Sequence, residues 1–134
     1  DQDASVIRAL PYLGPFVYPD GTYKPLRGIE TVTDLLETCR LNYPEEYQTW
    51  KVVSLEHYRG EAGLPGEVIE LLSKEGDASV RLIFSANLDF RLQLDRLRHI
   101  REVARGLRDS LERVDLSLSN AAAVKFRSGR DKLL

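Results

Sequence analysis

The residues best suited to chemistry in this sequence are seven arginines between positions 91 and 113, a stretch without lysine. Four of them are spaced three, four and three residues apart, so on a helix they would share one flank. These four are Arg98, Arg101, Arg105 and Arg108. A guanidinium group binds carboxylates and phosphates through paired hydrogen bonds. The flank is therefore the strongest candidate for a binding surface.

The chain could also neutralise this flank itself. Acidic residues lie three or four positions from the arginines, namely Asp95, Glu102, Asp109 and Glu112. A nucleic-acid surface usually leaves more positive charge unpaired and adds exposed aromatic side chains, whereas the expected helix has only Phe90, at its start. We therefore expect the arginines to face acidic groups of this chain, of another copy or of a different protein. Nucleic acid or anionic lipid is the less favoured partner.

Other reactive residue types are too few or too scattered to predict a catalytic or metal site. His57 and His99 are the only imidazoles, and no His and Cys residues have metal-ligand spacing. Glu45 and Glu46 are adjacent, which fits the first turn of a helix better than an acid pair. Cys39 falls on an apolar helix face, so we expect a buried, inert thiol. We predict no catalytic residue, no metal and no cofactor.

A glycine-rich segment, Gly60-Glu-Ala-Gly63-Leu-Pro-Gly66, separates a predicted strand from a predicted helix. Phosphate-binding loops occur at such positions. Its spacing matches neither the dinucleotide nor the P-loop pattern. Glu67 would also bring a carboxylate to the N-terminus of the helix, where it would repel an anion. We interpret the segment as a connection rather than a phosphate site.

The main element expected to position the arginines is a long amphipathic helix over 87–118, capped by Asn87 or Asp89. Its apolar residues are spaced alternately three and four positions apart, which is the spacing of a heptad seam. They are Leu97, Ile100, Ala104, Leu107, Leu111, Val114 and Leu118. Such a seam packs against a partner helix or against the sheet of its own chain. We predict that Leu107 and Leu111 are buried in either case.

Upstream of this helix, the sequence predicts short elements. Apolar residues recur at helical spacing on one face over 29–41, and the best strand pattern is Val80-Arg-Leu-Ile-Phe84. A strand over 48–58 and a helix near 66–74 lie between them. Asp20-Gly21 predicts a hairpin turn.

The fold class is therefore α+β, with a small antiparallel sheet, short helices and one long C-terminal helix. We predict a single domain over 1–134, with a mixed head over 1–86, the helix over 87–118 and a basic tail over 119–134.

Composition favours an ordinary soluble protein. The chain has 134 residues, of which 43% are hydrophobic and 30% charged, and no apolar run is long enough to cross a bilayer. Its lone cysteine mildly favours a reducing compartment. The start at Asp1 lacks a signal-peptide pattern, which leaves open a targeting segment removed earlier.

Charge is divided unevenly along the chain. Residues 1–80 carry fourteen acidic and seven basic residues, whereas residues 81–134 carry seven acidic and twelve basic ones. Such a division favours docking of one half on the other, or on a partner. We predict a non-catalytic subunit that assembles with itself or another protein through Leu97, Ile100, Leu107, Leu111, Val114 and the four arginines. The alternative is a nucleic-acid-binding module.

Overall fold

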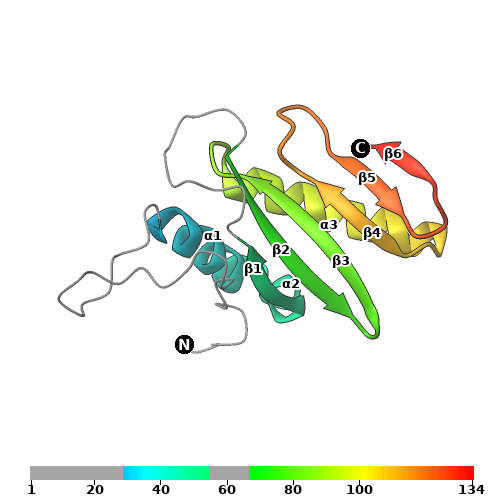
Figure 1. The fold of residues 1–134 in the computed structure, drawn as a ribbon, viewed down its shortest axis with the longest axis horizontal. Helices are drawn as coiled ribbons and strands as arrows, with labels where there is room; N and C mark the ends of the chain where they lie inside the picture. The colour runs from blue at the N-terminus through cyan, green and yellow to red at the C-terminus, as the bar shows by residue number, and fades with distance from the viewer. Residues whose placement is uncertain (1–28, 55–66) are drawn as a thin grey trace, which may run out of the picture.

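The computed structural model describes residues 29–54 and 67–134, which form three helices and six strands. Figure 1 shows them in chain order. They are α1 (Ile29–Asn42), α2 (Pro44–Thr49), β1 (Trp50–Ser54), β2 (Val68–Glu75), β3 (Ala78–Ser85), α3 (Phe90–Leu107), β4 (Leu111–Asp115), β5 (Ala123–Phe126) and β6 (Asp131–Leu133). The α+β class predicted from sequence is confirmed.

The six strands form one sheet in sequence order, from β1 at one edge to β6 at the other. All neighbouring strands are antiparallel except β3 and β4, which are parallel. Parallel neighbours need a crossover connection, and α3 provides it (Figure 1). The predicted small, antiparallel sheet is therefore corrected to a larger, mixed one.

The hydrophobic core lies between the sheet and the helices. Along β3, the alternate residues Val80, Leu82 and Phe84 are buried in this core. The facing stripe of α3 includes Leu94 and Leu97, which are almost fully buried. This one-sided arrangement explains the strand and helix periodicities at these positions. It also shows that the chain's own sheet occupies the apolar stripe of α3.

The longest helix is internal, which corrects the predicted C-terminal helix over 87–118. It begins after Asp89, whose carboxylate accepts a hydrogen bond from the Arg91 N–H at 2.9 Å. One of the two predicted caps is thus confirmed. The helix ends at Leu107 because Arg108 adopts a left-handed conformation with φ of 53°. The N–H of Asp109 then donates to Ala104 O at 3.1 Å, as at many helix C-termini.

The sequence after α3 forms strands. The predicted basic tail over 119–134 contains β5 and β6, and β4 occupies the predicted last turns of the helix. The segment predicted as a helix near 66–74 is strand β2, so that prediction is wrong. Glu67 is buried immediately before β2 and is not part of a helical turn.

The remaining predicted elements are confirmed in part. The helix predicted over 29–41 is α1, and the strand predicted over 80–84 lies within β3. The strand predicted over 48–58 is present as β1, and helix α2 occupies the positions immediately before it. The predicted Asp20-Gly21 hairpin and the glycine-rich segment from Gly60 to Gly66 lie outside the described residues. Within the described ranges, no helix is both long and apolar enough to span a membrane.

Candidate functional site

The side chain of Arg101 connects three elements on the helical side of the molecule. Its Nε donates to Glu46 Oε1 at 2.7 Å and its Nη2 to Glu46 Oε2 at 2.8 Å, so α3 binds α2 through a bidentate pair. Its Nη1 lies 3.1 Å from Glu75 Oε1 at the end of β2. Only 8% of the Arg101 side chain and 13% of the Glu46 side chain are exposed. A pair this buried is costly to break from one side.

Neighbouring polar groups complete this network. Trp50 Nε1 donates to Glu46 Oε2 at 2.8 Å. Ser73 Oγ accepts from Arg101 Nη2 at 3.1 Å and donates to Thr49 Oγ1 at 2.8 Å. Both carboxylate oxygens of Glu46 are therefore hydrogen-bonded, which offsets the cost of removing its charge from water. We call Arg101, Glu46, Ser73, Thr49 and Trp50 the Arg101 network.

Two groups in or beside the Arg101 network have shifted pKa values. Burial lowers the pKa of Arg101, but the hydrogen bonds and charge of Glu46, followed by the charge of Glu75, outweigh burial and raise the pKa above its usual value. Burial also raises the pKa of the Cys39 thiol, with the Glu46 charge adding to the effect and Arg101 opposing it. Arg101 therefore stays charged, and Cys39 stays a neutral thiol.

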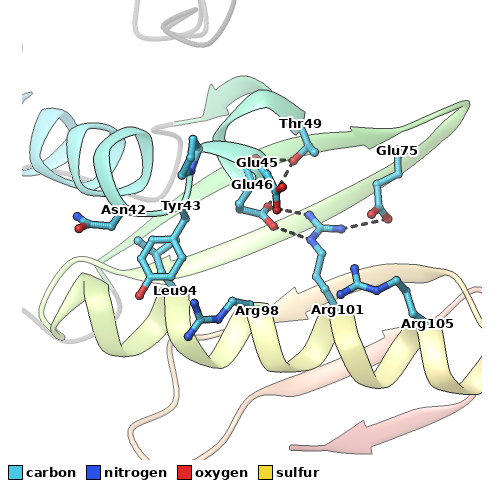
Figure 2. A pocket seen from close by; sticks show the side chains of 11 residues that line it. Asn42, Tyr43, Glu45, Glu46, Thr49, Glu75, Leu94, Arg98, Arg101 and Arg105 are labelled. Carbon is cyan, nitrogen blue, oxygen red and sulfur yellow. Dashed lines mark hydrogen bonds and ion pairs between the residues drawn. The ribbon is translucent and has the colours of Figure 1, made fainter.

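A cavity of about 480 Å³ opens beside the network, between α2 and α3 (Figure 2). Arg98, Arg101 and Arg105 line it from α3, while Glu45, Glu46 and Thr49 line it from α2. Its remaining lining residues are Asn42, Tyr43, Pro44, Glu75 and Leu94. The volume falls within the range of small-molecule sites. The walls carry equal numbers of arginine and glutamate side chains.

The cavity's other rim is formed around Tyr43. Its hydroxyl donates to Asp95 Oδ1 at 2.5 Å, and the same oxygen accepts from Arg98 Nη2 at 3.1 Å. The Arg98 guanidinium also lies 5.5 Å from the centre of the Tyr43 ring, within cation–π distance. Burial raises the pKa of Tyr43, and the hydrogen bond and charge of Asp95 raise it further. Arg98 is thus positioned at the rim while most of its side chain stays exposed.

The structure separates the predicted apolar seam into two elements. Leu97 and Ile100 are completely buried in the core beneath α3, and Leu107, the last residue of α3, is 37% exposed. Leu111 and Val114 are buried too, but they belong to β4. Leu111 is buried as predicted; Leu107 is not. No single helical surface therefore carries all five residues.

The four predicted arginines also differ in environment. Arg101 is buried in the network, whereas Arg98, Arg105 and Arg108 are exposed. Arg98 pairs with Asp95, as expected for a self-paired face. The Arg105 side chain makes no ion pair or hydrogen bond with any residue that the structure describes. Arg108 ends the helix.

The remaining candidates lie mostly where the sequence indicated. Cys39 is fully buried, as predicted. Glu45 and Glu46 lie in the first turn of α2, also as predicted, although Glu46 turns inward to Arg101. His99 is on the exposed side of α3, and His57 lies outside the described residues. Among described residues, no group of His, Cys, Asp and Glu could hold a metal ion.

Sequence reasoning missed the outer edge of β6. Ala122 and Leu134 exchange backbone hydrogen bonds of 2.6 and 2.8 Å, and the Phe126 N–H donates to Arg130 O at 2.8 Å. Because such bonds alternate along an antiparallel pair, Asp131 and Leu133 direct their backbone N–H and C=O groups away from β5. No described strand lies on that side.

Some signals for these missed features were present. Pro44 followed by two glutamates indicated a helix start, and Trp50 four residues after Glu46 could have indicated the hydrogen bond between them. Nothing in the sequence indicated that Ser73 would meet Arg101, because that contact depends on the tertiary fold. The β6 edge had no signal either, since its three residues show no strand periodicity.

The cavity and the β6 edge are thus two surfaces, among the residues that the structure describes, on which a partner or ligand could act. Comparison with known protein families, curated proteins and solved structures finds no match to this chain, so the geometry alone carries the functional argument.

Proposed function

We propose that this chain is a non-catalytic interaction subunit that binds an extended strand of a different protein along the outer edge of β6. The observation that carries the proposal is the backbone of Asp131 and Leu133, which no strand of the described residues pairs on its outer side. Two N–H and two C=O groups in register are a template for a further strand. Leu133, 70% exposed, adds an apolar side chain to this template.

The sheet edge is a better candidate than the helix seam considered from sequence. Leu97, Ile100 and Leu111 fill the core of their own chain, so a partner could reach them only if the domain opened. Opening would expose the core and break the Arg101–Glu46 pair. The β6 edge needs no such rearrangement, because its hydrogen-bonding groups already face outward.

Self-association through this edge is disfavoured by charge. The register that overlaps two antiparallel copies of β6 most fully pairs Asp131 with Leu133 of the second copy. It also places Lys132 directly opposite Lys132 of that copy. Like charges at directly opposed positions destabilise strand pairing, and edge lysines commonly prevent sheets from joining. A partner of different sequence would avoid this repulsion.

Site-specific photocrosslinking in the cells that produce the chain tests the proposal. A photoactivatable phenylalanine analogue replaces Leu133, or Leu41 on α1, which is 63% exposed and serves as the matched control. We expect a discrete adduct with another protein at position 133 and none at 41. Equal adducts at both positions, or an adduct made only of two copies of this chain, would contradict strand addition by a different protein.

A backbone variant then tests the geometry. Asp131→Pro removes an outward N–H and keeps the bonds to β5, so it should reduce the adduct formed at position 133. Asp131→Asn changes the charge and keeps that N–H, so its adduct should persist. If both variants lose the adduct equally, the aspartate charge carries the contact instead of the backbone. If nucleic acid crosslinks at position 133 in place of protein, the alternative predicted from sequence is favoured.

A further inference from the structure

Beyond strand binding, we propose that the cavity between α2 and α3 binds a small ligand through an oxyanion group, either a carboxylate or a phosphate, held by Arg105 and Arg101 with Arg98 at the rim. This site lies on the helical side of the molecule and does not involve β6 (Figures 1 and 2). It is therefore independent of the strand-binding proposal.

The first argument is the incomplete bonding of Arg101. Glu46 and Ser73 take the hydrogen bonds of its Nε and Nη2. Its Nη1 is buried and lies 3.1 Å from Glu75 Oε1, which gives an ion pair without an aligned hydrogen bond. A buried N–H group with a charged neighbour but no aligned hydrogen bond gains from a better-placed acceptor. An oxyanion inside the cavity would supply that acceptor.

The second argument is the position of Arg105. It lies one helical turn after Arg101, so the two guanidinium groups reach the same cavity (Figure 2). The Arg105 side chain has no ion-pair or hydrogen-bond partner among the residues that the structure describes. Arginine forks are well suited to oxyanions, and two of them on successive turns can contact different oxygens of one group.

Glu46 and Glu75 also line the cavity, and they differ in how strongly they oppose an incoming anion. Glu46 accepts hydrogen bonds from Arg101 and Trp50, so both of its carboxylate oxygens are already held. Glu75 is different, because its side chain is 47% exposed and holds Arg101 through a single contact. Glu75 therefore acts as a replaceable occupant of the Nη1 position. An arriving oxyanion would displace it toward solvent.

Trp50 provides the readout. It is the only tryptophan of the chain, and its indole N–H bonds the same carboxylate that holds Arg101. Inorganic phosphate or acetate is titrated into the full chain at constant ionic strength, with chloride as the replaced anion. Tryptophan fluorescence and the NMR resonance of the indole N–H are followed. We expect a saturable change with at least one of the two anions. A response to phosphate alone indicates a phosphate ligand, and a response to acetate alone a carboxylate.

Three variants make the test specific. Arg105→Gln should weaken binding about tenfold or more, because it removes a charged hydrogen-bond donor. Glu75→Gln should tighten binding, because it removes the competing carboxylate from Arg101. Arg96→Gln is the matched control, since Arg96 lies on α3 outside the cavity and contacts Leu118 O instead. We expect it to bind as the parent does.

Several outcomes would overturn the proposal. One is that neither anion produces a change that differs from chloride. Another is that Arg96→Gln weakens binding as much as Arg105→Gln, which would indicate a general charge effect. Binding that weakens in Glu75→Gln would show that this carboxylate belongs to the site and does not compete for it. None of these results depends on β6, so failure here leaves strand addition to be judged by its own crosslinking test.

Discussion

The Arg101 network and the β6 edge treat polar groups in opposite ways. In the network, a buried charge is matched by Glu46, Ser73 and their neighbours within the same chain. At the edge, Asp131 and Leu133 direct backbone groups away from β5, where no described strand pairs with them. The first region therefore holds the fold together, and the second is where we propose that another molecule binds.

The difference shows that residue type alone is a poor guide to an interface. Four arginines at helical spacing suggested a binding flank. Arg101, the most buried of them, instead pairs with Glu46 inside the chain. A charge buried beside its partner adds specificity to packing, because removing either member leaves the other unpaired. Exposed backbone groups are chemically unremarkable in sequence, since every non-proline residue carries them.

The first prediction tests whether Arg101 holds the fold together. Arg101→Met should lower the free energy of unfolding by about 3–5 kcal/mol, because it leaves the Glu46 carboxylate without its bidentate partner. Urea denaturation of the full chain measures this loss. We expect the matched change Arg105→Met, at an exposed position, to stay within about 0.5 kcal/mol.

The double variant sharpens the interpretation. Adding Glu46→Gln to Arg101→Met removes the unpaired charge while keeping an acceptor for Trp50, so part of the loss should be recovered. No recovery would mean that the packing of the arginine side chain matters more than its charge. Equal losses for Arg101→Met and Arg105→Met would show that the two arginines do not differ as the structure indicates.

The apolar seam gives the second prediction. Leu111→Ala should cost about 2–5 kcal/mol, because Leu111 is only 3% exposed in the core. Leu107→Ala should cost clearly less, since Leu107 is 37% exposed. Thermal or urea unfolding of both variants measures the difference. A continuous helix with one buried seam, as expected from sequence, would instead give similar losses at the two positions.

The helix predicted over 87–118 was too long because the apolar residues of β4 have helix-like spacing. The pairing of β4 with β5 shifts register between Leu111 and Arg113, which marks a β-bulge. The extra residue puts Leu111 and Val114 on the same face three positions apart, a spacing that resembles a helix. The end of the helix was also hard to predict, because Arg108 adopts a left-handed conformation that glycine normally provides.

Strand β2 was predicted as a helix, because its apolar pattern is interrupted. Ile69, Leu71 and Ser73 alternate into the core, but the serine breaks the apolar pattern by which a strand is recognised. Its polar side chain is present because Arg101 needs an acceptor there. Elements with uninterrupted periodicity, such as α1 and β3, could be predicted from local sequence. The sites could not, because both depend on which elements the fold makes neighbours.

The third prediction compares two substitutions by proline within β6. Lys132→Pro should cost about 1–2 kcal/mol, because the alternation of the ladder directs the Lys132 N–H toward β5. Leu133→Pro should change the free energy of unfolding little, since its N–H faces outward. Hydrogen exchange at Val124 and urea unfolding of both variants measure this contrast. The reverse order of the two losses would mean that the register of β6 is wrong and that the proposed edge is not free.

The smallest expected effect concerns Cys39, which lies near the charges of the Arg101 network. An acid whose pKa is higher in the folded chain stabilises the fold fully below its unfolded pKa and loses that contribution as pH rises above it. The cysteine pKa is raised by burial, and an unfolded thiol titrates near pH 8.5. The free energy of unfolding should therefore fall by roughly 1 kcal/mol more between pH 7 and 9 in the parent than in Cys39→Ala. Urea unfolding at both pH values measures this difference. The native thiol should also react slowly with a labelling reagent at pH 9, because Cys39 is buried. Labelling at the rate of a free peptide would show that the helix face carrying Cys39 opens readily, although the Arg101 network lies beside it.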